Sequence, residues 1–331
     1  MNEKILITGG AGFIGLHLAR RLLDEGYQVD LLDNFARAVD DKELKDILAQ
    51  DKINFYNIDL LATDQINRLA TDYDVIFHLA AIIGVAHVMD YPYDVLYKNI
   101  NMLGNMIDFA RKQDKLSRFL FASTSEVYAG TLKHFDLPIP TPEATPLAVT
   151  NLSYPRTSYM LSKIYGEALC QQSGLPFTVF RPHNIYGPRM GMAHVIPEQL
   201  RNAHEAEEGD RIDVFSINHT RCFCYIDDAV EMLLRIMVKD DCEGRTLNLG
   251  TQNPELKIKE VVQQCFSVVG KELFIDERPE TPGSPSRRVP DMTKTSSLLG
   301  YESQVSIQSG VVKTYEWYRK NVFDQDLENA F

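Results

Sequence analysis

The chain has 331 residues, of which 44% are hydrophobic and 24% charged, a composition typical of a globular protein with a large core. Its formal net charge of −12 would repel a nucleic-acid backbone, so we expect no nucleic-acid partner. Apolar runs stay shorter than the ~18 residues that a membrane span needs, and the first run leads into glycines rather than to a signal-peptide cleavage site. We therefore expect a cytoplasmic protein that does not contact a membrane.

The first half of the chain alternates strand and helix patterns. A β-branched run at 4–9 ends in glycine, and apolar residues then recur at helical spacing over 13–26. Further strands are predicted at 27–33, 53–60, 74–81, 118–124 and 176–182, and further helices near 64–71, 93–112 and 158–173. Continuous apolar strands that alternate with helices indicate an α/β fold with a doubly wound parallel sheet of the Rossmann type.

After residue 182 this alternation loosens. Prolines and glycines cluster at 182–197 and 278–291, and helices are predicted near 226–239, 257–269 and 306–320. We interpret 1–182 as the sheet domain, to which later segments near 220–250 return. We interpret 183–331 mainly as a smaller C-terminal lobe that binds substrate and closes over the carboxyl edge of the sheet.

The segment ITGGAGFIG at 7–15 stands between the first strand and the first helix. Its Gly9, Gly12 and Gly15 permit a tight turn and a close approach of the backbone to a pyrophosphate on the helix N-terminus. Asp33 ends the second strand, 18 residues after Gly15, where a carboxylate would bind the ribose hydroxyls of NAD and repel the 2′-phosphate of NADP. The sheet domain is therefore expected to bind NAD.

A tyrosine and a lysine stand four residues apart in YMLSK, so Tyr159 and Lys163 lie on one face of a predicted helix. A free phenol has a pKa near ~10 and is a weak base at neutral pH. An ammonium group within ~4–6 Å stabilises the phenolate and lowers that pKa. The pair is therefore a candidate catalytic base with its tuning group.

The cysteines point to a structural rather than a metal-binding role. Two of the five form a CxC in RCFCYIDD, and no second cysteine pair or histidine cluster stands at metal-ligand spacing. We therefore expect reduced cysteines and no metal site. The five are Cys170, Cys222, Cys224, Cys242 and Cys265.

Four motifs occur in order: TGGAGFIG near the N-terminus, HLAA after the fourth strand, STSEVY after the fifth, and YxxSK on the next helix. Together they resemble the extended short-chain dehydrogenase/reductase family, and within it the NAD-dependent nucleotide-sugar epimerases, dehydratases and decarboxylases. The resemblance covers essentially the whole chain. It implies an enzyme that oxidises C4 of a nucleotide-diphosphate sugar with tightly held NAD, changes the 4-keto sugar and reduces it again.

The resemblance also implies roles for single residues. Tyr159 would take the proton of the C4 hydroxyl, Lys163 would tune Tyr159 and hold the nicotinamide ribose, and Thr124 would hydrogen-bond the same C4 oxygen. Asp59, in the third predicted strand, would approach the adenine edge. The implied NAD contacts are Gly9, Gly12, Phe13, Ile14, Gly15, Asp33, Asn34, Asp59, Leu60, Leu79, Ala80, Ala81, Tyr159 and Lys163.

The substrate diphosphate calls for arginines, because a guanidinium binds phosphate with two parallel hydrogen bonds. By resemblance, Arg221 and Arg288 are the pyrophosphate arginines, and Arg287 is a further candidate cation. The implied substrate contacts are Asn101, Asn184, Arg189, Arg221 and Arg288, and the segment 194–200 is expected to frame the base.

Ser125 and Glu126 are expected to decide which reaction follows oxidation at C4. By resemblance, the carboxylate of Glu126 favours a sugar 4,6-dehydratase, in which it handles the protons at C5 and C6. The alternatives are a UDP-glucuronate decarboxylase, in which the two residues orient the sugar, and a 4-epimerase. An NADPH-dependent ketosugar reductase and an inactive NAD-binding homologue belong to other classes. Asp33 argues against the first of these, and the intact catalytic residues argue against the second.

Members of the family commonly dimerise through the helices near 93–112 and 158–173, so a homodimer is expected. The chain departs from the family pattern after STSEVY, where Ala129 precedes the usual glycine. The long segment 131–156 before Tyr159 is a second departure, and it either shapes the sugar pocket or lies at the surface.

Overall fold

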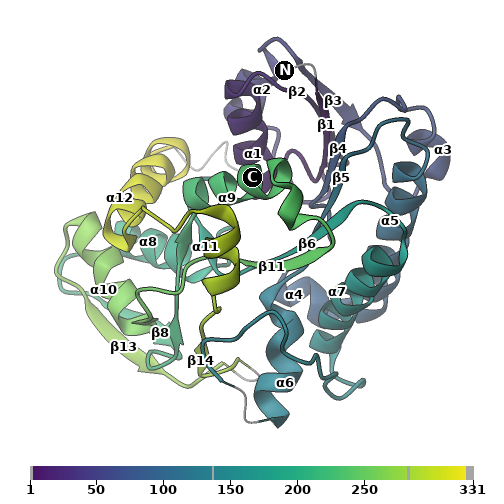
Figure 1. The fold of residues 1–331 in the computed structure, drawn as a ribbon. Coiled ribbons are helices and arrows are strands. Elements are labelled where there is room, and N and C mark those ends of the chain that lie inside the picture. The colour runs from purple at the N-terminus through teal and green to yellow at the C-terminus, as the bar shows by residue number, and fades with distance from the viewer. Residues whose placement is uncertain (1–2, 136–137, 282–283, 326–331) are drawn as a thin grey trace.

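A parallel sheet of seven strands lies at the centre of the computed structural model, which describes residues 3–135, 138–281 and 284–325 (Figure 1). The strands are β1 (Lys4–Thr8), β2 (Gln28–Asp33), β3 (Ile53–Asn57), β4 (Val75–His78), β5 (Arg118–Ala122), β6 (Phe177–Pro182) and β11 (Arg245–Leu249). Their order across the sheet is β11, β6, β5, β4, β1, β2, β3. The chain reverses its direction of winding beside β1, which confirms the Rossmann-type fold predicted from the sequence.

Helices cover both faces of the sheet because successive strand residues point to opposite sides. Ile5 and Ile7 of β1 belong to the core beneath α1 (Phe13–Asp24) and α9 (Ile226–Val238). Leu6 belongs to the core beneath α5 (Pro92–Ala110) and α7 (Pro155–Gln172) on the other face. Strands that are buried on both faces read as continuous apolar runs, which is the pattern that the sequence contains.

Before residue 182, short helices account for most differences from the sequence prediction. After residue 182, the helices Val195–Glu205 and Thr293–Leu299 and all the strands were not predicted. The helix predicted at 64–71 is only α3 (Thr63–Ile66), because the following amides of Arg68 and Leu69 bond to carbonyls three residues back and tighten the chain into turns. The helices α2 (Lys42–Leu48), α4 (Val85–Asp90) and α6 (Ala129–His134) were not predicted. Each spans fewer than eight residues, too short to display a helical period.

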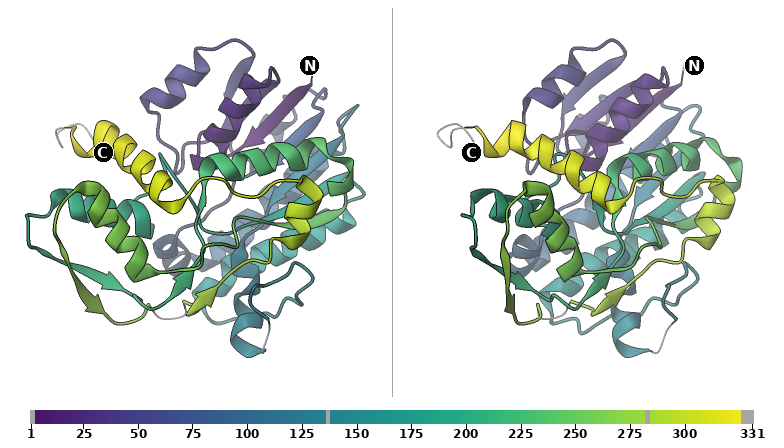
Figure 2. Two further views of the ribbon diagram at one scale, coloured as in Figure 1. Left: turned by 60° about the vertical axis from the view of Figure 1, so that its left-hand side comes forward. Right: turned by 90° about the vertical axis from the view of Figure 1, so that its left-hand side faces the viewer.

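Residues after 182 build a smaller lobe beside the carboxyl edge of the sheet (Figure 2). It has its own apolar core between α8 (Val195–Glu205), α10 (Ile258–Val269) and the parallel pair of β8 (Arg211–Phe215) and β13 (Phe274–Arg278). The other elements after residue 182 include β7 (Ile185–Tyr186), β10 (Cys224–Tyr225), α11 (Thr293–Leu299) and α12 (Ile307–Tyr318), which continues into a helical turn at Arg319–Phe323. Two further helical turns lie at Ser125–Tyr128, after β5, and at Asp240–Cys242, after α9. β11 belongs to this half of the chain in sequence, but it pairs with β6 in the central sheet.

A small three-stranded sheet lies between the two parts and carries three arginines. It is formed by β12 (Leu256–Lys257), β9 (Thr220–Arg221) and β14 (Arg287–Arg288). The long segment before α7 runs past the end of β14. The amide of Thr141 donates to the carbonyl of Val289 over 2.8 Å, and its own carbonyl accepts from the amide of Asp291 over 2.9 Å. The segment therefore supports β14 rather than forming a separate surface excursion.

In the described part of the chain, no helix is both long enough and apolar enough to cross a bilayer.

Candidate active site

The glycine turn after β1 is packed too closely to accept side chains. Gly9 has φ +70°, and a methyl group on it would lie 2.9 Å from the amide nitrogen of Ala80. A methyl group on Gly15 would collide with the carbonyl oxygen of Gly9. Gly12 forms the N-cap of α1, so the turn leads into the positive end of that helix. This is the environment in which a dinucleotide pyrophosphate binds.

Asp33 lies at the end of β2, directly beside this turn. Its two carboxylate oxygens accept hydrogen bonds from the amides of Ala11 at 3.2 Å and Phe35 at 2.9 Å. Burial raises the pKa of Asp33, while these amides and the charge of Arg189 oppose the rise. The carboxylate is therefore held in place next to the glycine turn, as the prediction of a ribose contact requires.

A hollow of about 270 Å³ lies between the carboxyl ends of β1 to β4. It is lined by Gly9, Leu32, Asp33, Asn34, Ile58, Leu60, Ala80 and Met102. Apolar walls beside a carboxylate fit an adenosine, and together with the glycine turn they fit NAD. Five of the predicted NAD contacts line this hollow, whereas Leu32, Ile58 and Met102 were not predicted. Asp59 is exposed, and one of its oxygens accepts from the amide of Leu61 at 2.9 Å.

The other predicted NAD contacts surround the same turn. Phe13 and Ile14 begin α1 directly after it. Leu79 and Ala81 flank Ala80 in the segment that follows β4, against which Gly9 packs.

Tyr159 and Lys163 lie on α7 with their side chains toward the end of β5. The ammonium group of Lys163 donates to the carbonyl of Ala122 over 2.7 Å and lies 5.8 Å from the centre of the Tyr159 ring. Burial lowers the pKa of Lys163 to about 8. Burial also raises the pKa of Tyr159 above its ordinary value, and a hydrogen bond with Thr124 is the main effect that opposes this rise.

The electrostatic environment of Tyr159 includes groups that the sequence prediction did not name. The prediction relied on Lys163 to lower the pKa of the phenol. In this structure burial and the charge of Glu126 raise that pKa, while Thr124 and the positive charge of Arg37 lower it. The ammonium group of Lys163 joins α7 to the end of β5, and its effect on the pKa of Tyr159 stays a prediction.

A buried hydrogen-bond network holds the catalytic segment after β5. Glu167 lies on α7, and its carboxylate binds Arg181 of β6 through two hydrogen bonds of 2.8 and 2.6 Å. The hydroxyl of Ser123, next to Thr124, donates to the same carboxylate over 2.5 Å. Arg181 also donates to the hydroxyl of Tyr128 over 2.6 Å. The segment 123–128 is thus fixed at both ends against α7 and β6.

Glu126 forms an ion pair with Arg288 across the boundary between the sheet and the lobe. The distance from Nη1 of Arg288 to Oε1 of Glu126 is 2.9 Å, and the same nitrogen lies 3.4 Å from the hydroxyl of Ser125. The charge of Arg288 is the main cause that lowers the pKa of Glu126, and Arg156 and Arg221 add to it. Glu126 is therefore a carboxylate, not a carboxylic acid, at neutral pH.

Arg221 and Arg288 stand side by side on β9 and β14. Arg221 donates to the hydroxyl of Ser284 over 3.0 Å and to the carbonyl of Pro285 over 2.6 Å. Burial and the charge of Arg288 lower the pKa of Arg221 to about 10. Two neighbouring guanidinium groups without equal negative charge favour a multiply charged anion, as predicted for the diphosphate.

Arg287 points away from this cluster, because neighbouring residues of a strand face opposite sides. Its guanidinium forms two hydrogen bonds of 2.7 Å with the carboxylate of Glu255, half-exposed at the surface.

A second hollow, of about 310 Å³, lies in the lobe. It is lined by Asn184, Ile185, Tyr186, Met190, His194, Val195, Ile196 and Phe223. Asn184, in a left-handed conformation with φ +42°, donates to the carbonyl of Cys222 over 3.0 Å. The hollow includes the start of the segment that was predicted to frame the base.

Two predicted substrate contacts lie elsewhere. Arg189 donates to the glycine turn and to Asp41, on the NAD side of the site. Asn101 donates to the carbonyl of Tyr97 on its own helix. Asn99 is instead the buried amide of α5, and it bonds to both backbone groups of Ile82 at 2.7 and 3.0 Å.

The helical period would have identified Asn99. Val95, Asn99, Met102 and Met106 form the buried stripe of α5, and Asn101 does not belong to it. Arg37 and Arg156, whose charges act on Tyr159 and Glu126, were also missed. Arg156 precedes Tyr159 by three residues and could have been found by the same spacing, whereas Arg37 comes from a distant loop. In residues 3–135, 138–281 and 284–325, no group of three or more His, Cys, Asp or Glu side chains could hold a metal ion.

Comparison with known families gives a match over most of the chain. Residues 5–250 match the model of the NAD dependent epimerase/dehydratase family. A UDP-N-acetyl-alpha-D-glucosaminuronate decarboxylase of Bacillus cytotoxicus is 34% identical over 97% of this chain and 99% of its own length. A UDP-glucuronic acid decarboxylase 1 of Danio rerio is 31% identical over 98% of this chain and 74% of its own.

Solved structures give the same picture. The UDP-glucose 4-epimerase of Thermotoga maritima, solved with UDP-glucose, superposes with a TM-score of 0.83 at 27% identity, over 96% of this chain and 99% of that one. The UDP-glucuronic acid 4-epimerase of Bacillus cereus, solved with UDP-glucuronic acid and NAD, has a TM-score of 0.83 at 26% identity and the same coverage.

The glycine turn provides a direct test of the cofactor site. In Gly15→Ala the added methyl group would collide with the Gly9 carbonyl, so the turn must open and the pyrophosphate loses its amide donors. We expect the purified variant to retain about one tenth of the wild-type amount of NAD or less, which corresponds to a loss of about 1.4 kcal/mol of binding free energy. The measurement is the NAD released per chain on denaturation. Gly104→Ala is the control, because a methyl group there meets no atom within 4 Å. Equal NAD content in wild type and Gly15→Ala would contradict this assignment.

The ion pair between Glu126 and Arg288 predicts a pH-dependent contribution to stability. Glu126→Gln should lower the free energy of unfolding at pH 7 by about 1–3 kcal/mol, as for a hydrogen bond to a charged group. Because the folded-state pKa of Glu126 is lowered, this stabilisation is complete above the pKa of the unfolded carboxyl and is lost as pH falls through the folded pKa. Urea unfolding should show the difference at pH 7 and its disappearance below about pH 4.

The adjacent arginine supplies a matched control. Glu255→Gln removes the partner of Arg287 at a half-exposed site and should cost less than about 1 kcal/mol. A cost for Glu126→Gln that does not exceed that of Glu255→Gln, or that stays constant with pH, would mean that the pair of Glu126 and Arg288 does not stabilise the fold.

Proposed function

The chain belongs to the NAD-dependent epimerase/dehydratase family and is an NAD-dependent enzyme of nucleotide-sugar chemistry, and from this premise we propose that it decarboxylates a nucleotide-sugar uronate after oxidation at C4. The observation that carries this proposal is the ion pair between Glu126 and Arg288. A carboxylate held in its charged form is suited to orient a substrate rather than to donate a proton to it.

Decarboxylation next to a ketone follows from elementary chemistry. When the C5–CO2 bond breaks, its electron pair passes into the carbonyl at C4, so C4 must be oxidised first. Tyr159 takes the proton of the C4 hydroxyl, and Thr124 holds the same oxygen through its own hydroxyl. NAD, when bound, would supply the acceptor for the C4 hydride and the donor for its later return, and C5 takes up a proton after CO2 has left.

The charge state of Glu126 distinguishes the proposed decarboxylase from a 4,6-dehydratase, the reaction that a glutamate at this position favours by resemblance. In a 4,6-dehydratase a group at this place would take the C5 proton and pass a proton to the leaving C6 hydroxyl, so it must hold a proton during the reaction. Arg288, Arg156 and Arg221 all lower the pKa of Glu126 and therefore oppose its protonation. A decarboxylase loses CO2 instead of water, and no acid is needed for the leaving group.

The charge distribution also favours a uronate. A nucleotide-sugar uronate adds a carboxylate to its diphosphate, and the chain has a net charge of −12. Against that background, Arg156, Arg221 and Arg288 surround a single carboxylate, that of Glu126. A local excess of positive charge in an acidic protein attracts such a substrate. Two of the relatives, at 34% and 31% identity, are named as uronate decarboxylases.

The proposal predicts the mass of the product. Purified protein with NAD should remove CO2 from UDP-glucuronate or UDP-N-acetylglucosaminuronate and leave UDP-glucose, UDP-N-acetylglucosamine, GDP-mannose and dTDP-glucose unchanged, as followed by mass spectrometry. Tyr159→Phe, which removes the base, should lower turnover by about 100-fold or more while nucleotide-sugar binding persists.

Other products would replace the proposal. Loss of water from a neutral sugar would indicate a 4,6-dehydratase, and an unchanged mass with a changed retention time would indicate an epimerase. Consumption of one NADPH per sugar would indicate a ketosugar reductase. Binding without conversion of any donor would indicate an inactive homologue.

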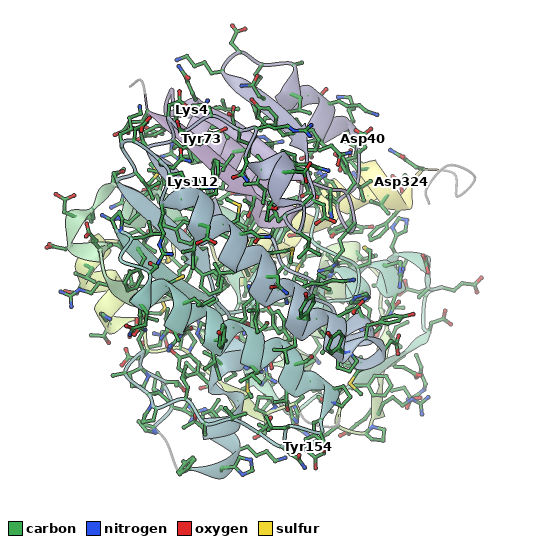
Figure 3. All side chains as sticks on the ribbon, turned by 90° about the vertical axis from the view of Figure 1, so that its right-hand side faces the viewer. Lys4, Asp40, Tyr73, Lys112, Tyr154 and Asp324 are labelled. Carbon is green, nitrogen blue, oxygen red and sulfur yellow. The ribbon has the colours of Figure 1, made fainter. Side chains whose placement is uncertain are left out.

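We further propose that the enzyme is a homodimer that pairs through α5 and α7. These helices lie side by side at the front of the molecule in Figure 3, and the short helix α4 packs against both. Tyr93, Tyr97 and Tyr165 are exposed on this face, and the rings of Tyr93 and Tyr97 stack at 5.7 Å. Tyrosine is enriched at the centre of protein interfaces, where its ring is buried at little entropic cost.

Tyr97→Glu should therefore shift the protein to monomers at micromolar concentration, because it places a charge in the interface. Sedimentation or light scattering measures the mass. Phe215→Glu is the matched control, since Phe215 on β8 is 55% exposed and Tyr97 is 54% exposed. The proposed interface is wrong if both variants keep the mass of the wild type.

A further inference from the structure

One arginine of the second lobe reaches back to both loops that surround the NAD site. Arg189 follows β7, and its side chain is only 7% exposed. Its Nε donates to Asp41 over 2.6 Å, its Nη1 to the carbonyl of Ala11 over 2.7 Å, and its Nη2 to the carbonyl of Val39 over 2.8 Å. A cation that is buried in this way depends on each of these partners.

The bond to Ala11 acts on the glycine turn. The amide of Ala11 donates to Asp33, while its carbonyl accepts from Arg189. Nη1 of Arg189 also lies 3.4 Å from the carbonyl of Gly12, the N-cap of α1. Arg189 therefore binds the carbonyl side of the peptides whose turn receives the pyrophosphate.

The bond to Asp41 acts on the loop between β2 and α2. One oxygen of Asp41 caps α2 by accepting from the amide of Leu44 over 2.9 Å, and the other binds Arg189. The loop 34–40 is thus held at its start by Asp33 and at its end by Asp41. Arg37, in the middle of this loop, carries a charge that lowers the pKa of Tyr159. The loop therefore extends from the predicted ribose contact to the catalytic tyrosine.

On the side of the second lobe, Arg189 adjoins the second hollow through its neighbour in the chain. Met190, the next residue, lines that hollow together with Asn184 and His194. Pro188, the preceding residue, is bound through its carbonyl to His17 of α1 over 3.1 Å. A displacement of this segment by a nucleotide sugar would be transmitted directly to the guanidinium of Arg189.

We propose that Arg189 is a positioning residue that couples the two ligand sites, so that NAD is released only when the segment of the lobe around Arg189 moves. Binding of a nucleotide in the second hollow fixes this segment and with it the two loops around NAD. NAD retention and nucleotide binding are then coupled, and the coupling is reciprocal by thermodynamic linkage. This inference requires NAD binding but not decarboxylation, so it holds for any product of the enzyme.

The experiment measures the rate at which the NAD-loaded, full-length chain loses NAD, with and without UDP as the probe of the second hollow. In the wild type, UDP should slow NAD loss. Arg189→Met should lose NAD about 5- to 150-fold faster, the usual range of a coupling between sites, and UDP should no longer slow the loss. The readout is bound NAD per chain against time after gel filtration, and no turnover is required.

Two further variants separate coupling from general destabilisation. Asp41→Asn removes the charged partner of Arg189 but keeps a good N-cap for α2, so the helix stays intact. Arg189→Lys keeps the charge and one donor group and should lie between wild type and Arg189→Met. The effects of Arg189→Met and Asp41→Asn should be non-additive, because both remove the same interaction.

Arg20→Met is the matched control. Arg20 joins α1 to Glu43 of α2 over 3.1 Å, next to the same loop. Glu43 also accepts a hydrogen bond from Trp317 of α12, so the contact between α2 and the second lobe survives the loss of Arg20. The Arg20→Met variant should lose NAD at the wild-type rate. The proposal is overturned if Arg189→Met retains NAD as the wild type does, if Arg20→Met accelerates loss equally, or if UDP fails to slow NAD loss in the wild type.

Discussion

The buried carboxylate of Glu167 joins the three elements on which the chemistry depends. It binds Arg181 of β6, accepts from Ser123 at the end of β5, and is itself carried by α7, the helix of Tyr159 and Lys163. Both members of the ion pair are about 4% exposed. A buried pair of this kind is costly to break, because either partner alone would leave an uncompensated charge in the core. The distance between α7 and the TSE segment (residues 124–126) is therefore set by electrostatics as well as by packing.

The parallel direction of the strands determines where the residues of the site lie. Their carboxyl ends meet at one edge, so the glycine turn, Asp33, the TSE segment and α7 converge although they are distant in sequence. The second lobe adds arginines at the same edge through a sheet of only three short strands. The site thus combines a preformed surface for NAD with a cationic wall for the substrate, and Glu126 and Arg288 meet where the two parts join.

The sequence was sufficient for the fold because its strands are long apolar runs and its motifs follow one another in a known order. It also indicated the glycine turn, Asp33 and the tyrosine–lysine pair, since these depend on local spacing. It failed where the answer depends on contacts between distant segments. Arg189 and Arg221 are both arginines in the second half of the chain, and only the fold shows that one donates to the glycine turn and that the other stands beside Arg288. The charge state of Glu126 likewise depends on Arg288, which is 162 residues away in the chain.

Because β14 consists of two arginines, the charge that it presents to the site does not depend on its register against β9. Side chains alternate along a strand, so a shift of one residue in the pairing of β14 with β9 would turn Arg288 outward and Arg287 inward. In most strands such a slip would exchange an apolar face for a polar one. Here it would replace one guanidinium by another of the same charge and reach. A ladder of only two residues specifies its register weakly. With an arginine at both positions of β14, the active site keeps its positive charge in either register.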